Sequence, residues 1–311
     1  MKHFSSLNDI TSLELLIDEA LSIKSSPYQY LDLGKHKNLL MLFFNSSLRT
    51  RLSTEKAARQ LGMSITTMNV TDTWQLEFDD GVVMDLDRSE HIKDAAQVVS
   101  QYADMIAIRA FPTLKHKEED EKEIIISSFK KYASIPVINL ESATEHPLQA
   151  LADAITITEF KNTSRPKVVL SWAPHPKALP QSVANSFATM MQNLDVDFSI
   201  THPLGYEINP DITKNTPVIY NQEEALKHAD FVYVKNWSSY TDYGKILITD
   251  SNWMLTKEKL GHAHFMHCLP VRRNVVVEDS VLDSNQSLVI EQANNRTFAA
   301  QAVMKQLLEH L

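Results

Sequence analysis

The sequence predicts an α/β protein made of two doubly wound parallel-sheet domains. Apolar runs rich in β-branched residues alternate with segments of helical periodicity along the chain. Strands that alternate with helices in this way form parallel sheets covered on both faces. The 311 residues are enough for two domains of ordinary size, each with its own hydrophobic core.

The first predicted domain covers residues 1–150. Residues 1–21 have the pattern of an amphipathic helix, and Gly62 ends a helix that passes through 53–62. Pro147 stands in the first turn of a later helix, where proline fits best. The remaining elements follow from periodicity, with strands at 38–44, 64–70, 104–111 and 135–142 and helices at 89–103 and 146–160.

The second predicted domain covers residues 151–293. Its strands are expected at 167–174, 197–203, 230–237 and 262–269, with helices from about Gln181 and Glu223. A last helix, 294–311, is expected to pack back on the first domain. The acidic stretch 115–123, "KHKEEDEKE", is interpreted as a solvated loop or helix face.

Composition excludes several classes of function. The net charge of −9 argues against a nucleic-acid partner, and no apolar run is long enough to suggest a membrane anchor. The single cysteine, Cys268, fits a reducing compartment, so we expect a cytoplasmic protein. With six glycines and no G-x-G-x-x-G or P-loop, the sequence offers no fingerprint for a nucleotide cofactor.

Polar clusters follow five of the predicted strands. In open parallel sheets, ligands bind beyond the carboxyl ends of the strands, so five clusters at that edge suggest a cleft between the domains. They are "NSSLRT" at 45–50, Arg109, Glu141 with His146 and Gln149, "KNW" at 235–237, and "HCLP" at 267–270.

The turn "NSSLRT" can bind an anion without glycine. Asn45, Ser46 or Ser47 can cap the helix that follows, which leaves backbone N–H groups and the positive dipole end facing the cleft. Arg49 adds a planar guanidinium that matches phosphate oxygens. The alternative is an ordinary capped helix whose arginines pair with Glu55 or other acids.

Three motifs resemble those of the carbamoyltransferase family. "SLRTR" resembles its carbamoyl-phosphate signature, "HPLQ" its His-Pro-x-Gln element, and "HCLP" its C-terminal signature. They occur in family order at roughly family spacing and span nearly the whole chain. The resemblance implies an active site between the two domains, no metal or organic cofactor, and a homotrimer with sites at subunit boundaries.

The resemblance also implies roles for individual residues in the first reaction steps. Ser47, the Leu48 backbone, Arg49 and Thr50 would hold the phosphate of carbamoyl phosphate, with a further contact from Arg296. Arg109, His146 and Thr50 would direct donors at the carbonyl oxygen as it becomes negative, each such donor being worth about 3 kcal/mol. Gln149 and the Leu269 carbonyl would orient the carbamoyl NH₂, beside Cys268. As plainer alternatives, His146 caps a helix, Arg109 forms an interdomain salt bridge, and Cys268 is a buried small hydrophobe.

The predicted amine substrate, which accepts the carbamoyl group, depends on Lys235. Ornithine carbamoyltransferases carry an Asp-x-x-x-Ser-Met-Gly element whose acid pairs with the α-ammonium, but this chain has "VKNWSSYTDYG" there. A lysine repels an ammonium and can bind a carboxylate, so the α-nitrogen of the substrate is expected to be acylated. The departure resembles the N-acylornithine branch of the family. By that resemblance Lys235 and Asn185 would bind the α-carboxylate, Glu141 would engage the δ-amine, and Phe111 would line the pocket.

Two surface loops refine this hypothesis. The "TDTWQLE" segment resembles the same branch and would send Trp74 into the neighbouring subunit's site, unless Trp74 packs under its own loop. Ser89 stands where the family has glutamate for acetyl or proline for succinyl substrates and matches neither. Serine does not repel a second carboxylate, which favours N-succinylornithine over N-acetylornithine. The proline-bearing segment 174–180 is either a mobile flap or a rigid turn.

Rival functions remain at this point. Free ornithine as the acceptor is the nearest alternative, and residue 235 discriminates it. A dehydrogenase lacks its glycine fingerprint here. A catalytically silent binding protein of the same fold is disfavoured because the chain retains Ser47, Arg49, Thr50, Arg109, His146 and Gln149.

Overall fold

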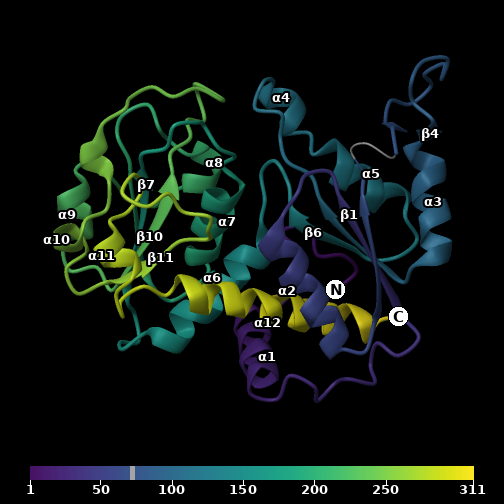
Figure 1. The fold of residues 1–311 in the computed structure, drawn as a ribbon, viewed down its shortest axis with the longest axis horizontal. Helices are drawn as coiled ribbons and strands as arrows, with labels where there is room; N and C mark the ends of the chain where they lie inside the picture. The colour runs from purple at the N-terminus through teal and green to yellow at the C-terminus, as the bar shows by residue number, and fades with distance from the viewer. Residues whose placement is uncertain (71–73) are drawn as a thin grey trace. The chain divides into compact units, whose positions relative to one another are not determined.

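The computed structural model describes residues 1–70 and 74–311, which form two compact units (Figure 1). Unit 1 consists of Met1–Thr113, Glu118–Leu148 and Arg296–Leu311. Unit 2 consists of Leu114–Lys117 and Gln149–Asn295. Two helices, α6 (Pro147–Phe160) and α12 (Val289–Leu308), contribute residues to both units.

Within the described residues, unit 1 is built on a four-stranded parallel sheet of order β2-β1-β5-β6. The order reverses between β1 and β5, and such a switch point is where ligands bind in open α/β sheets. The strands are β1 (Asn38–Phe43), β2 (Ser64–Asn69), β5 (Met105–Arg109) and β6 (Val137–Glu141). The other elements of this part of the chain are η1 (Leu7–Asp9), α1 (Leu13–Ser25), α2 (Leu48–Gln60), β3 (Leu76–Glu77), β4 (Glu90–His91), α3 (Ile92–Tyr102), α4 (Lys117–Asp120) and α5 (Ile124–Tyr132).

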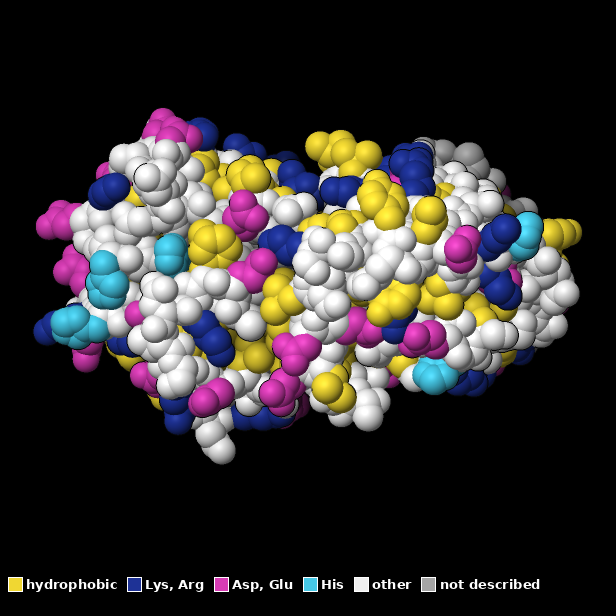
Figure 2. Space-filling view, turned by 90° about the horizontal axis from the view of Figure 1, so that it is seen from below, with side chains coloured by type: hydrophobic (Ala, Val, Ile, Leu, Met, Phe, Trp, Pro, Cys, Tyr) yellow, Lys and Arg dark blue, Asp and Glu magenta, His cyan; other side chains and the backbone are white. Residues whose placement is uncertain are grey.

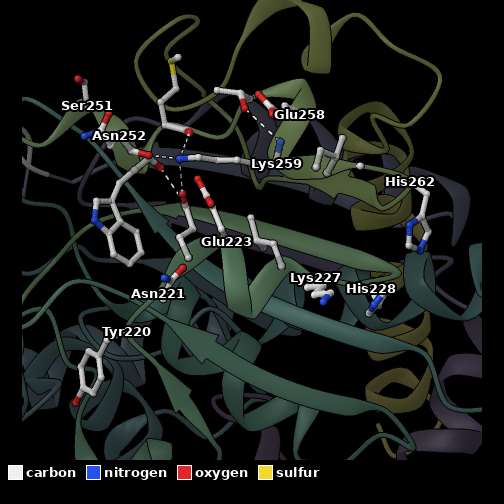
Figure 3. A pocket seen from close by; sticks show the side chains of 17 residues that line it. Tyr220, Asn221, Glu223, Lys227, His228, Ser251, Asn252, Glu258, Lys259 and His262 are labelled. Carbon is white, nitrogen blue, oxygen red and sulfur yellow. Dashed lines mark hydrogen bonds between the residues drawn. The ribbon is translucent and has the colours of Figure 1, made fainter.

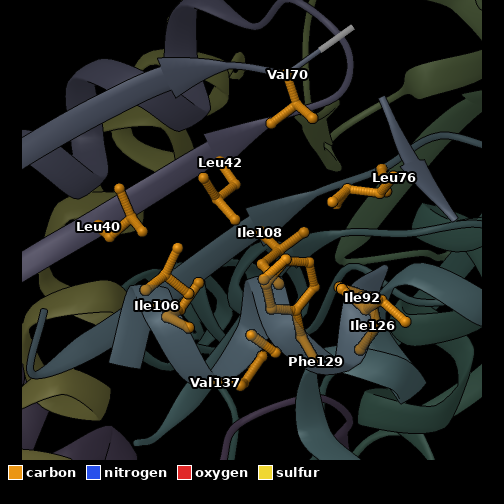
Figure 4. Close-up of a cluster of buried hydrophobic side chains, with 14 of the residues drawn as sticks. Leu40, Leu42, Val70, Leu76, Ile92, Ile106, Ile108, Ile126, Phe129 and Val137 are labelled. Carbon is orange, nitrogen blue, oxygen red and sulfur yellow. The ribbon is translucent and has the colours of Figure 1, made fainter. Parts of the chain in front are cut away.

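Helices cover both faces of this sheet. The connections through α2 and α3 run in opposite directions from strand to strand, and right-handed crossovers therefore place them on opposite faces. Leu40 and Leu42 of β1 pack on one face with Ile92 of α3 and Phe129 of α5 (Figure 4). Their neighbours Leu39 and Met41 point to the other face, so β1 is buried and apolar on both sides. This is why β1 appears in the sequence as one continuous apolar run.

Unit 2 contains a parallel sheet of order β11-β10-β7-β8-β9 among its described residues, with a switch point between β7 and β10. Its strands are β7 (Lys167–Ala173), β8 (Asp197–Thr201), β9 (Val218–Ile219), β10 (Phe231–Asn236) and β11 (His264–Met266). Its helices besides α6 and α12 are α7 (Ser182–Met191), α8 (Pro210–Thr213), α9 (Gln222–Leu226), η2 (Ser251–Trp253), α10 (Lys257–Leu260) and α11 (Asp279–Leu282).

The expected α/β class with parallel sheets is confirmed, and the main strands lie where periodicity placed them. Two expected helix starts are wrong. The helix expected from Ser89 begins at Ile92, because Glu90 and His91 pair with β3. The last helix begins at Val289 rather than Asn294. Helix α5 was not expected at all.

The expectation of a helix over residues 1–21 is wrong for its first half. Helix α1 begins at Leu13, and Phe4 instead joins the sheet beside β6. The Phe4 N–H donates to the Val137 carbonyl at 2.9 Å, and the Phe4 carbonyl accepts from the Asn139 N–H at 2.8 Å. The Phe4 side chain is fully buried. Helical periodicity cannot reveal this pairing, because its partner lies more than a hundred residues away in sequence.

The surface carries both signs of charge. On the face drawn in Figure 2, Lys and Arg side chains are interspersed with Asp, Glu and hydrophobic side chains. Across residues 1–70 and 74–311, no helix combines the length and the apolar character needed to cross a bilayer.

Candidate active site

The turn after β1 leads directly into the N-terminus of α2. Ser47 occupies the N-cap position, but among the described residues its side chain accepts no capping hydrogen bond. The Oδ1 of Asn45 accepts from the Phe111 N–H at 2.6 Å instead. Ser47 therefore leaves the first N–H groups of α2, beginning with that of Leu48, uncapped. These groups and the positive end of the helix dipole suit an anion.

The two arginines of this turn have different surroundings. The Nε of Arg51 donates to Glu55 Oε1 at 3.1 Å, one helical turn away. Arg49 makes no ion pair or hydrogen bond with any residue that the structure describes. The alternative of an arginine paired with Glu55 therefore holds for Arg51, while the half-buried Arg49 has its guanidinium available for a ligand.

Arg109, at the end of β5, is held from two sides. Its Nη1 donates to the carbonyl oxygens of Asn45 at 3.1 Å and Ser46 at 2.8 Å. Its Nε and Nη2 donate to Glu141 Oε2 at 3.2 and 3.1 Å, and its guanidinium carbon lies 3.9 Å from the ring centroid of Phe111. Burial lowers the pKa of Arg109, Glu141 opposes this, and the nearby charge of Arg49 lowers it further. The salt bridge of Arg109 is thus with Glu141 of its own unit.

His146 ends the loop that joins β6 to α6. Its Nε2 lies 3.6 Å from the same Oε2 of Glu141, and its side chain is buried. Glu123 fixes the start of this loop. Glu123 Oε1 accepts from the Ser142 hydroxyl at 2.7 Å, from the Thr144 N–H at 2.7 Å and from the Thr144 hydroxyl at 2.6 Å.

Arg296 and Thr50 complete this group. The Nη2 of Arg296, on α12, donates to the Thr50 hydroxyl oxygen at 2.6 Å, and both side chains are buried. Three guanidinium groups, those of Arg49, Arg109 and Arg296, are therefore held on or beside segment 45–50. Guanidinium groups and helix N–H groups together suit an anion, and we call segment 45–50 with these three arginines the anion cradle.

In unit 2, Lys235 and Asn185 are both buried. Lys235 lies on β10 opposite Trp172 of β7, and Lys235 is only 7% exposed. Asn185 lies on α7. Among the described residues Lys235 has no salt bridge, although a buried ammonium normally has an acidic partner.

The segment after β11 carries Cys268 and Leu269. Cys268 is half-buried and forms no disulfide. Leu269 has a φ of +55°, a left-handed conformation that is uncommon for leucine, and its N–H donates to His267 Nδ1 at 2.8 Å. Such backbone conformations are concentrated at functional sites, and this one fixes the direction of the Leu269 carbonyl. Gln149, in the first turn of α6, is buried and donates to Asp153 at 2.7 Å.

Trp74 and Ser89 lie just before β3 and β4, the two short strands that pair with each other. The Trp74 Nε1 donates to Glu90 Oε2 at 2.7 Å, and its ring packs against the hydrophobic cluster of unit 1. The Ser89 hydroxyl donates to the Gln75 carbonyl at 3.1 Å. Of the "TDTWQLE" segment, residues 71–73 lie outside the described residues.

Segment 174–180 is held through His175. The indole N–H of Trp237 donates to the His175 carbonyl at 3.2 Å, and Arg272 Nε donates to His175 Nε2 at 3.2 Å. Burial lowers the pKa of His175, the Lys177 carbonyl opposes this, and the charges of Arg272 and Lys235 lower it further. Lys235 therefore lies within electrostatic range of this segment.

A pocket of about 1200 Å³ opens elsewhere in unit 2 (Figure 3). Lys259 extends across it and donates to Gln222 Oε1 at 2.8 Å and to the carbonyl oxygens of Asn252 and Met254. Burial lowers the pKa of Lys259. None of the residues predicted to act on substrate lines this pocket. The Lys259 ammonium is already hydrogen-bonded to two other chain segments, at Gln222 and at 252–254.

Two family models cover most of the chain. The carbamoyl-P binding domain of aspartate/ornithine carbamoyltransferases matches residues 2–159, and their Asp/Orn binding domain matches residues 180–307. The chain belongs to the aspartate/ornithine carbamoyltransferase family. It is therefore an enzyme, a carbamoyltransferase.

Relatives and solved structures agree with this membership. The carbamoyltransferase is 49% identical to the N-succinylornithine carbamoyltransferase of Bacteroides fragilis, over 100% of both chains. It is 34% identical to the N-acetylornithine carbamoyltransferase of Xylella fastidiosa, over 99% of this chain and 98% of that one. An acetylornithine transcarbamylase complexed with acetylcitrulline superimposes with a TM-score of 0.93 at 34% identity, covering 99% of each chain. A mutant N-acetyl-L-ornithine transcarbamylase complexed with carbamyl phosphate and N-succinyl-L-norvaline also gives 0.93 at 34% identity, over 99% of this chain and 100% of that one.

Two carboxylates of this carbamoyltransferase have structural roles that were not expected from the sequence. Glu123 ends the stretch that was interpreted as solvated, and nothing in the local pattern indicates that it contacts residues 142–144. Asp153 did leave a signal: it follows Gln149 by four positions, so both lie on one face of α6. The spacing could therefore have indicated a contact between Gln149 and Asp153, which is fully buried in the structure.

Proposed function

We propose that the protein transfers the carbamoyl group of carbamoyl phosphate to the δ-amine of an N-acylated ornithine. The products are the N-acylcitrulline and phosphate, in a route of arginine biosynthesis. The observation that carries the choice of acceptor is the buried ammonium of Lys235, which has no acidic partner among the described residues. The names of the relatives from Bacteroides fragilis and Xylella fastidiosa, both acylornithine carbamoyltransferases, support the same choice.

Lys235 selects the acceptor through charge. An α-carboxylate supplies the anion that a buried ammonium requires, and Asn185 adds a polar side chain for the same group. The α-ammonium of free ornithine would meet Lys235 as a like charge. Acylation removes that charge and leaves the carboxylate, so an N-acylornithine fits the position and free ornithine does not.

Carbamoyl phosphate is assigned to the cradle of unit 1. Ser47, the Leu48 N–H, Arg49, Thr50 and Arg296 bind the phosphate. Arg109 and His146 donate to the carbonyl oxygen, which becomes negative when the neutral δ-amine attacks the carbonyl carbon. Glu141, already between Arg109 and His146, receives the amine end of the acceptor. The C–O bond to phosphate then breaks, and the departing phosphate takes up the proton that the nitrogen loses.

Residues 1–150 with the last helix, 294–311, form the carbamoyl-phosphate domain in this proposal, and residues 151–293 form the acylornithine domain. Gln149 and the Leu269 carbonyl orient the carbamoyl NH₂, with Cys268 beside it. The enzyme works in the cytoplasm as a homotrimer in which Trp74 reaches the neighbouring site. Phe111, 36% exposed against the Arg109 guanidinium, supplies an apolar wall for the pocket.

N-Succinylornithine is the preferred acceptor in this proposal. Ser89 carries no charge, so it does not repel the second carboxylate of a succinyl group. Two relatives named N-succinylornithine carbamoyltransferases, at 49% and 47% identity, support this preference over the acetyl substrate.

A direct assay tests the acceptor. The purified protein is incubated with carbamoyl phosphate and, separately, ornithine, N-acetylornithine or N-succinylornithine, and the ureido product is measured. We expect the highest kcat/KM with N-succinylornithine and the lowest with ornithine. Preference for free ornithine would contradict the role of Lys235, and preference for the acetyl substrate would contradict only the role of Ser89.

Lys235→Gln is the matching variant. It should raise the KM for N-succinylornithine by about 10- to 100-fold, because a charge-assisted contact is worth roughly 1.5–3 kcal/mol. The KM for carbamoyl phosphate should stay within about twofold. Lys227→Gln, at an exposed lysine just before β10, is the control and should change neither constant.

A further inference from the structure

Asp153 joins Gln149 to the segment that carries Cys268 and Leu269. It lies one helical turn after Gln149 on α6 and is fully buried in unit 2. Its Oδ1 accepts from Gln149 Nε2 at 2.7 Å and from Gln292 Nε2, on α12, at 2.8 Å. The Oε1 of Gln292 in turn accepts from the His267 N–H at 2.9 Å. One carboxylate thus fixes two glutamine side chains at once.

The carboxylate also determines which way each amide faces. An amide has a donor end and an acceptor end of nearly equal shape, whereas an ionised carboxylate only accepts. In the structure Gln149 turns Nε2 toward Asp153 Oδ1, and Oε1 is the opposite end of its amide. Gln292 is fixed in the same sense from both sides, because its Oε1 takes the His267 N–H and its Nε2 takes Asp153.

We propose that Asp153 is a positioning residue that holds the Gln149 amide with its oxygen toward the substrate, so that the enzyme selects a carbamoyl NH₂. The inference rests on the role proposed above for Gln149. An NH₂ group can donate to Oε1, whereas a methyl group in its place cannot. Without the acceptor at position 153 the amide is free to turn, and the selection for N–H is lost.

A purely structural role makes a different prediction. If Asp153 only ties α6 to α12 within unit 2, its loss lowers stability and weakens binding of every donor analogue by the same factor. If it sets the polarity of Gln149, its loss weakens binding of analogues that carry the NH₂ group and spares those that do not.

Two inert phosphonates separate these roles. Phosphonoacetamide has a carboxamide NH₂, phosphonoacetone has a methyl group there, and both replace the bridging oxygen of carbamoyl phosphate with CH₂. By titration calorimetry the unaltered protein should bind the amide about tenfold more tightly than the ketone, the effect of one hydrogen bond. Asp153→Leu should reduce this preference to about twofold or less. Asp153→Asn, which keeps an oxygen acceptor, should retain most of the preference.

Each outcome bears on the proposal. The proposal is overturned if the unaltered protein does not prefer the amide over the ketone, or if Asp153→Leu retains that preference. It is also overturned if Asp153→Leu weakens the binding of both analogues by the same factor. Should Asp153→Leu fail to fold in a thermal melt, Asp153→Ser replaces it and must show the same loss, because its hydroxyl is too short to reach Gln149. Neither probe involves the acceptor amine, so this measurement stands or fails separately from the assay with acylornithines.

Discussion

Arg49 and Arg51 lie two positions apart in α2 and differ in whether they form an ion pair. Arg51 pairs with Glu55, whereas Arg49 has no partner among the described residues. Arg49→Gln should therefore raise the KM for carbamoyl phosphate by about 10- to 100-fold, since a charge-assisted contact to phosphate is lost. Arg51→Gln is the control and should leave that KM within about twofold. Equal effects in steady-state kinetics would show that the cradle does not include Arg49 specifically.

His202 makes stability depend on pH. It is buried after β8, and burial lowers its pKa, while the Pro203 carbonyl and Glu207 oppose this. The unfolded chain thus binds the proton more readily. The stability that neutral His202 contributes is fully present above its ordinary pKa of about 6.5 and is lost as the pH falls through that value toward the lower folded pKa.

Urea unfolding measures this effect. The free energy of unfolding should decrease between about pH 7.5 and 5.5, and the decrease should be smaller in His202→Gln. A residual decrease is expected in the variant, because the pKa values of His3 and His175 are also lowered. An identical pH slope in the variant and the unaltered protein would contradict the assignment to His202.

At the scale of elements, the loop between β6 and α6 depends on one carboxylate. Glu123 has a left-handed backbone, with φ of 50° and ψ of 40°, immediately before α5. From there its side chain reaches Ser142 and Thr144, ahead of His146. Helix α5 and the loop are thereby fixed to each other.

Glu123→Ala should lower the free energy of unfolding by about 1–3 kcal/mol, because several donors lose a shared acceptor. It should also lower kcat/KM at least about tenfold, since the loop that ends at His146 is loosened. Glu121→Ala, an exposed change in the same acidic stretch, should alter the free energy by less than about 0.5 kcal/mol. Loss of stability with unchanged kcat/KM would separate this loop from His146.

The elements that were predicted correctly are those whose own residues determine them. The runs of β1 and β5 are apolar on both faces. Gly62, where a helix was expected to end, has a φ of +81° and lies two residues past the end of α2. The pairing of Phe4 and the start of α5 at Ile124 depend on partners distant in sequence, such as Val137 and Ser142. Local periodicity contains no information about such partners.

The candidate site shows the same limit. Motifs indicated Arg49, Arg109 and Lys235, because each stands at the end of a strand or at a helix start. They could not show that Arg51 rather than Arg49 pairs with Glu55, nor that Arg109 binds Glu141 of its own unit. These choices depend on side-chain rotamers and on burial, which a linear pattern does not encode.

At the scale of the whole molecule, the proposed trimer can be tested by mixing defective subunits. If Trp74 completes the neighbouring site, Trp74→Ala and Arg49→Gln damage the same site from different subunits. Both homotrimers should be weakly active. Trimers refolded from an equal mixture should recover about a quarter of the normal sites, because one site in four draws both intact residues. Activity no higher than the mean of the two parents would assign Trp74 to its own subunit.

The pairing of Phe4 with β6 also matters for solubility. Without residues 1–5, β6 would present open hydrogen-bonding groups along a strand that is otherwise apolar and buried. Exposed strand edges recruit strands from other molecules. A protein without residues 1–5 should therefore aggregate during purification. The residues that cover this strand edge are as important for preventing aggregation as any charge on the surface of the enzyme.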